Sequence, residues 1–176
     1  MDDQSRSTNE TSTAASEGEQ KRVVILGVGN LLLSDEGVGV HVANKLMEMD
    51  LPEGVEVYEG GTDGFRLMSV VTGADRLIVV DAVKGGGEPG SIYRFDVNDA
   101  PSMPDSYKTS VHQIGILEVI HFSEFVGKGK TPETTILGIE PKSLEMAMEL
   151  TPEIAAKVPR VIELVLEEAQ AALAKK

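Results

Sequence analysis

The sequence predicts a three-layer α/β/α domain with a mostly parallel sheet. Short, continuously apolar segments at Arg22–Leu26 and Leu77–Val80 are typical of strands that are covered on both faces. Between them, Val42, Leu46 and Met49 recur at helical spacing, which predicts a helix from about residue 36 to residue 50. Alternating strands and helices indicate a parallel sheet between two helical layers.

Three further strands are predicted at Val55–Tyr58, Ser91–Val97 and Thr134–Ile139. The turn KGGGEPG separates the strand that ends at Val80 from Ser91–Val97. This gap is too short for a parallel crossover, so it favours an antiparallel hairpin. The sheet is therefore expected to contain one antiparallel strand.

Four more helices are predicted. One is a helix at 65–72 that Gly73 would cap, and another is a helix from Ser110 to about Val126 in which Phe125 is one of the buried positions. Ser143 is expected to cap a short helix, SLEMAMEL. The terminal helix is expected to start at Thr151-Pro152, with Pro159 either kinking it or marking its true start.

Composition narrows the class of protein. The formal net charge is −13, from 29 acidic and 16 basic residues, which argues against a broad surface for nucleic acid or anionic membranes. Cysteine is absent, which excludes thiolate metal sites and a cysteine nucleophile. Residues 1–20 read as a disordered acidic tail without the features of a secretory signal. We expect a single domain over 21–176, a cytoplasmic location and no membrane insertion.

The segment VVILGVGNLLLSDEGVGV begins like a nucleotide-binding loop and then departs from that pattern. A dinucleotide fingerprint needs a third glycine three residues after Gly29, and the chain has Leu32 there. Asp35 and Glu36 follow, in a place where a nucleotide would bring its own negative charge. The acidic loop therefore favours a cation over a phosphate.

Other polar residues follow the predicted strands, at the edge where ligands bind in such sheets. These candidates are Thr62, Asp63, Asp81 and His112. His121 lies nine residues beyond His112, about 900° of helical rotation away and so on the opposite helix face. His41 lies roughly 140° from Glu36 by the same measure. Two carboxylates and the His112 imidazole form a mixed oxygen and nitrogen site that suits Ni²⁺, Zn²⁺ or Mn²⁺.

Five motifs in order, GVGNLLLSDEGVGV, EGGTDG, LIVVDAV, SVHQIGI and LGIEPKSLE with LTPEI, resemble those of the [NiFe]-hydrogenase maturation endopeptidases over about residues 22–170. The resemblance implies a twisted, mostly parallel five-stranded sheet. It also implies removal of a C-terminal extension from the hydrogenase large-subunit precursor after nickel insertion. The matching metal-contacting and catalytic residues are Glu36, Asp81 and His112. Nickel supplied by the precursor is the expected ion, with zinc or cadmium as surrogates, and a monomer is expected.

Several points stay open at this stage. The ion either activates a water molecule or positions the substrate tail, and either Asp35 or Glu36 serves as proton acceptor. Gly60, Gly61 and Thr62 are candidates for substrate contact, as is Asp35, although an ordinary turn explains the glycines equally well. The rival functions are a nickel carrier or chaperone without hydrolase activity and a degenerate dinucleotide-binding domain.

Overall fold

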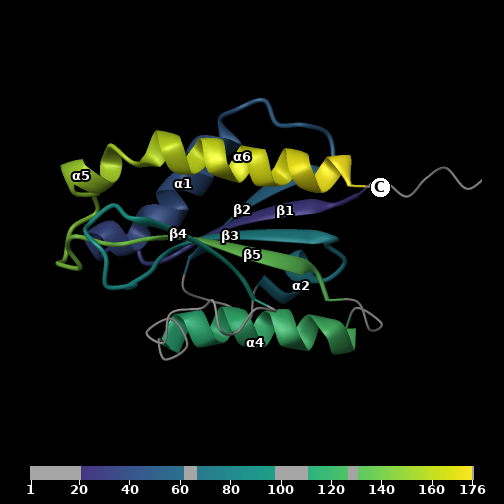
Figure 1. Ribbon diagram of the computed structural model, residues 1–176. Helices are drawn as coiled ribbons and strands as arrows, with labels where there is room; N and C mark the ends of the chain where they lie inside the picture. Colours follow the sequence, from purple (N-terminus) through teal and green to yellow (C-terminus); the bar gives the residue numbers. More distant parts are fainter. Residues whose placement is uncertain (1–20, 62–66, 98–110, 127–130, 176) are drawn as a thin grey trace, which may run out of the picture.

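The computed structural model describes residues 21–61, 67–97, 111–126 and 131–175, with the backbone alone for 111–114 (Figure 1). The predicted acidic tail, residues 1–20, lies outside this part of the chain. In the described part, no helix has the length and apolar character needed to cross a membrane.

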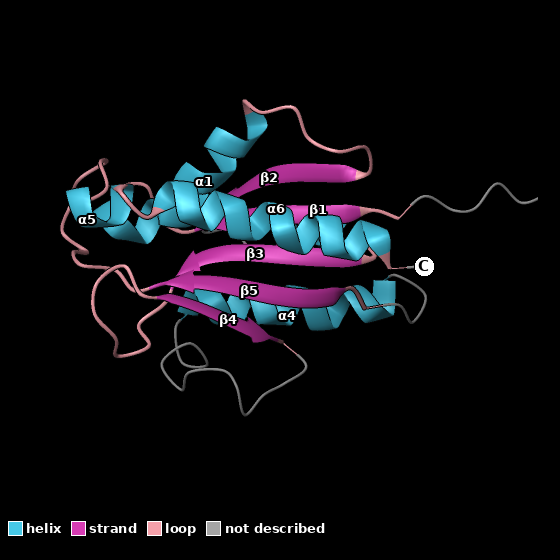
Figure 2. Cartoon of the chain, turned by 45° about the horizontal axis from the view of Figure 1, so that its top comes forward, coloured by secondary structure: helices cyan, strands magenta, loops and turns pink. Residues whose placement is uncertain are grey.

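The sheet has five strands in the order β2-β1-β3-β5-β4 (Figure 2). Four strands run parallel to their neighbours: β1 (Val23–Val28), β2 (Val55–Gly61), β3 (Arg76–Ala82) and β5 (Glu133–Ile139). β4 (Ile92–Asp96) is antiparallel to β5 and forms one edge. The predicted α/β class and mostly parallel five-stranded sheet are confirmed.

The predicted hairpin between the third and fourth strands is wrong. β5 lies between β3 and β4 and pairs with both of them. All but the first residue of β3 and of β5 are buried, whereas only Phe95 of β4 is fully buried. The more apolar β5 therefore takes the central position beside β3, and the half-exposed β4 is left at the edge.

Helices cover both faces of the sheet (Figure 1). On one face, α1 (Val38–Met47) and α6 (Val158–Ala174) pack on an aliphatic core that includes Ile25, Ile78 and Leu137. On the other face, α2 (Met68–Val71) and α4 (Val111–Val126) cover a second core that includes Leu26, Val79 and Ile136. Short helices η1 (Ser34–Gly37) and α5 (Pro152–Ala155) precede α1 and α6.

Three helix predictions need correction. The helix expected to start near residue 36 is divided into η1 and α1. The predicted helix SLEMAMEL is a loop, in which Ala147 forms a parallel bridge with Leu33. Phe125 was expected to be buried and is 83% exposed. Pro159 marks a helix start, since it is the second residue of α6.

An ion pair joins the start of the sheet to its β2 edge and makes stability depend on pH. Arg22 donates from Nη2 to Glu56 Oε2 at 2.8 Å, and the Tyr58 hydroxyl donates to the same oxygen at 2.6 Å. The guanidinium and then the hydroxyl lower the pKa of Glu56 from 4.5 to about 2. A lowered carboxyl pKa contributes stability that is fully present above the unfolded value and is lost as pH falls toward the folded value.

Glu56→Gln is therefore expected to lower the urea midpoint at neutral pH, and this difference from the wild type should shrink between pH 4.5 and about pH 2. Urea denaturation followed by circular dichroism across this range measures the effect. Glu53→Gln, which alters an exposed carboxylate, is the matched control. A difference that stayed constant down to the lowest pH would contradict the pairing.

Candidate functional site

The carboxyl ends of β1 and β3 and the start of α4 lie at the same edge of the sheet, on the left in Figure 1. η1, which carries Asp35 and Glu36, follows β1 directly and contacts β3. Asp81 is the penultimate residue of β3, and His112 is the second residue of α4. The fold therefore brings the chain segments that carry the predicted site residues to one edge.

Asp81 is a fully buried carboxylate near the end of its strand. Its neighbours Val80 and Ala82 belong to the core under α1 and α6, and successive strand residues point to opposite faces. The Asp81 side chain consequently points to the face covered by α2 and α4, the helix that begins with the His112 segment. Asp81 Oδ1 accepts a hydrogen bond from the Ala82 amide at 2.8 Å.

Glu36 is brought to this edge by glycine packing. A Cβ atom on Gly39 would lie 2.1 Å from the Val80 carbonyl oxygen and 2.3 Å from that of Val28, so only glycine lets α1 approach both strands this closely. Glu36, three residues earlier, is partly exposed beside the end of β3. The glycine-rich pattern therefore serves close packing of the helix on the sheet, which accounts for it without a phosphate.

Gly39→Ala is expected to destabilise the protein by about 3 kcal/mol, because the added methyl group meets backbone atoms that have no room to move. This corresponds to a fall in melting temperature of roughly 6–12 °C. Gly115→Ala is the control, since a Cβ at this position in α4 meets nothing within 4 Å and should stabilise the helix by up to about 1 kcal/mol. Equal melting temperatures for the two variants would refute the close approach.

Asp35 anchors the loop that follows β5. It is fully buried, and its Oδ1 accepts from the Thr151 amide at 2.7 Å. Its Oδ2 accepts from the amides of Lys142 and Ser143 at 3.0 and 2.9 Å and from the Thr151 hydroxyl at 3.0 Å. Both oxygens are thus engaged by the protein itself. This geometry favours Glu36 over Asp35 as proton acceptor and gives Asp35 a role that the sequence did not suggest.

Glu140 is a second buried anchor, and the sequence interpretation missed it. Its Oε2 accepts from the amides of three successive glycines, Gly85, Gly86 and Gly87, at 2.7, 3.0 and 3.3 Å. The Tyr93 hydroxyl donates to the same oxygen at 2.6 Å; burial, followed by this hydrogen bond, raises the pKa of Tyr93. Glu140 therefore holds the loop that follows Asp81. Its position directly after a buried strand was the available signal.

The remaining candidates have other surroundings. Gly60 and Gly61 end β2 instead of forming a loop, and a Cβ on Gly60 would lie 2.8 Å from Val28 Cγ1. Thr62 and Asp63 lie outside the described residues. His41 Nε2 is 3.2 Å from the Met148 carbonyl oxygen, and His121 Nδ1 is 2.7 Å from the Leu117 carbonyl oxygen of its own helix.

The side chain of His112 also lies outside the described part of the chain. Among the side chains that are described, no group of three or more histidine, aspartate and glutamate residues is arranged to hold a metal ion. Two carboxylates at one edge fit the oxygen part of a mixed site for a divalent ion. The assignment of Glu36, Asp81 and His112 as ligands stays a prediction.

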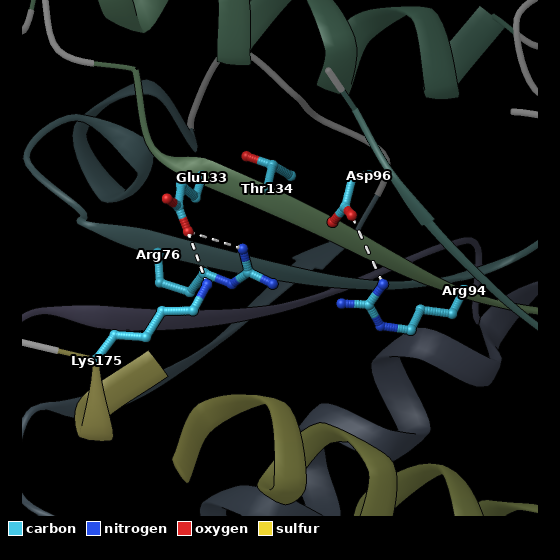
Figure 3. A pocket seen from close by; sticks show the side chains of 6 residues that line it. All are labelled: Arg76, Arg94, Asp96, Glu133, Thr134 and Lys175. Atoms are coloured by element: carbon cyan, nitrogen blue, oxygen red, sulfur yellow. Dashed lines mark hydrogen bonds and ion pairs between the residues drawn. The ribbon is translucent and has the colours of Figure 1, made fainter. Parts of the chain in front are cut away.

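A pocket visible in Figure 3 lies away from this edge. It is lined by Arg76, Arg94, Asp96, Glu133, Thr134 and Lys175. Arg76 and Glu133 begin β3 and β5, so the pocket lies at the opposite edge of the sheet. Glu133 pairs with Arg76 at 3.3 Å and with Lys175 at 3.6 Å, and Arg94 pairs with Asp96 at 3.6 Å. These ion pairs neutralise one another, which indicates a structural role.

The sheet order, the carboxylates at its edge and the sequence together define a class of protein. The hydrogenase maturation protease family model matches residues 40–168. The chain belongs to the hydrogenase maturation protease family. The matched range begins after η1 and includes Asp81 and His112.

Individual relatives agree with this class. The Hydrogenase 2 maturation protease of Escherichia coli (strain K12) is 36% identical over 147 residues, which are 82% of this chain and 88% of that protein. The solved structure of the hydrogenase maturating endopeptidase HybD from E. coli superposes with a TM-score of 0.76 at 35% identity, over 86% of this chain and 93% of that one. The [NiFe] hydrogenase maturation protease HybD from Thermococcus kodakarensis gives a TM-score of 0.70 at 29% identity, over 84% and 99% of the two chains.

Proposed function

We propose that this protein is an endopeptidase that removes the C-terminal extension of a [NiFe]-hydrogenase large-subunit precursor after nickel has been inserted. The observation that carries the proposal is the convergence of Glu36, the buried Asp81 and the start of α4 at one edge of the sheet. Its support from comparison is that the relatives with this fold are named hydrogenase maturation proteases.

The nickel ion in this proposal belongs to the substrate. Glu36 and Asp81 supply carboxylate oxygens and His112 supplies an imidazole nitrogen, a set that leaves room for ligands from the precursor. Holding the ion at the sheet edge would place the extension next to Glu36, so that binding at one point orients the bond to be cut. A precursor without nickel would lack this contact.

Glu36 is the proposed proton acceptor in peptide-bond hydrolysis. A water molecule attacks the carbonyl carbon of the scissile bond and gives a proton to the Glu36 carboxylate, and the carbon–nitrogen bond then breaks as the leaving amine takes up that proton. Glu36 is partly exposed, so water and substrate have access to it. Asp35, which is buried with both oxygens engaged, lacks this access.

Incubation of the purified protein with a nickel-loaded precursor tests the proposal. The expected result is a gel shift of the large subunit together with one released peptide, whose mass identifies the bond. A matched reaction without the protein controls for spontaneous cleavage. Loss or transfer of nickel with no change in precursor mass would instead show a nickel carrier.

A further inference from the structure

Three large apolar side chains stand in solvent on the loops that surround the proposed site. Leu32 is 58% exposed, Met146 is 88% exposed and Met148 is 63% exposed. Leu32 belongs to the loop between β1 and η1, whereas the two methionines belong to the loop between β5 and α5. We call Leu32, Met146 and Met148 the apolar platform.

The backbone beneath the apolar platform is firmly held. The Ala147 amide donates to the Leu32 carbonyl at 3.1 Å, and the Ser34 amide donates to the Ala147 carbonyl at 2.7 Å. Ser34 Oγ donates to the Glu149 carbonyl at 3.1 Å. These bonds join the two loops, so the three side chains form one surface.

Asp35 fixes the same pair of loops from below. Its buried carboxylate accepts backbone hydrogen bonds from both ends of the second loop, at Lys142, Ser143 and Thr151. A charged group is costly to bury without partners, and here the partners are the amides of the loop that carries the methionines. The fold therefore holds this loop in place while its methionines remain outside the core.

Apolar side chains held in solvent on a fixed backbone indicate a binding surface. Burying one such side chain stabilises a protein by about 1.5–3 kcal/mol, a gain that the isolated chain does not obtain here. Lys142, Glu145 and Glu149 around the platform are exposed, and an apolar patch with a polar rim is typical of a protein interaction site. Methionine side chains adapt to irregular partner surfaces.

We propose that the apolar platform docks an apolar surface of the large-subunit precursor next to its C-terminal extension, an inference that rests on the proposed function. Continuity with the candidate site identifies the occupant. Leu32 and Glu36 are four residues apart in one loop, a separation of at most about 14 Å. A protein substrate whose scissile bond reaches Glu36 therefore lies over the platform as well.

The test is a triple variant, Leu32→Gln with Met146→Gln and Met148→Gln, assayed on nickel-loaded precursor. We expect KM to rise at least about tenfold while kcat changes less than about twofold, because the platform binds substrate without touching the reacting atoms. Phe125→Gln is the matched control: this side chain is 83% exposed near the end of α4, at the opposite edge of the sheet, and its KM should equal that of the wild type.

Met146→Gln alone, at the most exposed position, keeps the test valid if the triple variant fails to fold, with a smaller rise in KM expected. An unchanged KM in the folded triple variant would overturn the docking inference while leaving the peptidase function intact. Self-association of the wild type that the triple variant loses, seen by analytical ultracentrifugation, would also overturn it in favour of a second copy.

Calorimetric titration with the same precursor separates this inference from the proposed function. If the wild type binds the precursor without cutting it, and the triple variant binds at least about tenfold more weakly, the docking inference holds and the peptidase function fails. Equal dissociation constants for the two proteins would refute the docking inference.

Discussion

Glu36→Gln and Asp81→Asn are each expected to slow precursor cleavage at least about 100-fold without unfolding the protein. Each change removes a negative charge from the sheet edge and keeps the size of the side chain. Loss of a group that stabilises charge or transfers a proton during the reaction typically costs about 10²–10⁴ in rate. In Asp81→Asn, the remaining amide oxygen still accepts from the Ala82 amide, which donates to Oδ1 in the wild type.

The rate of precursor shortening and the melting temperature must be measured together. Glu118→Gln is a suitable control, because it removes one negative charge from an exposed position of α4. Its cleavage rate should match that of the wild type. Wild-type cleavage by Glu36→Gln, with a normal melting temperature, would remove Glu36 from the reaction.

Nickel-loaded precursor is expected to be cut, whereas the nickel-free form stays intact over the same interval. The physical reason is that a set of oxygen and nitrogen ligands leaves coordination positions open, so the precursor's ion joins substrate to enzyme. Reagents directed at cysteine nucleophiles should have no effect, since the chain contains no cysteine. Mass spectrometry of the two precursor forms measures the difference.

The control for this experiment is a metal-free buffer with a chelator, used for the nickel-free precursor. Comparable cleavage of both forms under that condition would contradict recognition through nickel. The peptidase function would stand in that case, and the two carboxylates would then act directly on the peptide bond.

Much of the fold could be predicted because the signals are local. Continuous apolar runs such as Leu77–Val80 mark buried strands, and the carboxyl ends of parallel strands meet at one edge whatever their order. Asp81 and the loop with Glu36 could therefore be assigned to the same edge from the sequence. The screening of His41 and His121 depended only on helical spacing, and both have backbone partners in the structure.

The missed features depend on contacts between distant residues. β4 pairs with β5 across an intervening helix, and competition between strands for the central position decides that pairing. The segment SLEMAMEL has residues that favour a helix, yet Asp35, more than 100 residues earlier, takes up the amides at both of its ends. Tertiary hydrogen bonds of this kind override local propensity.

The convergence of Glu36, Asp81 and His112 on one ion is the central claim, and calorimetric titration with Cd²⁺ tests it most directly. The wild type is expected to bind one ion, with higher occupancy as the His112 imidazole loses its proton. His112→Ala should weaken binding at least about tenfold, whereas His41→Ala and His121→Ala should leave the affinity unchanged. Equal losses of affinity in all three histidine variants would contradict the site.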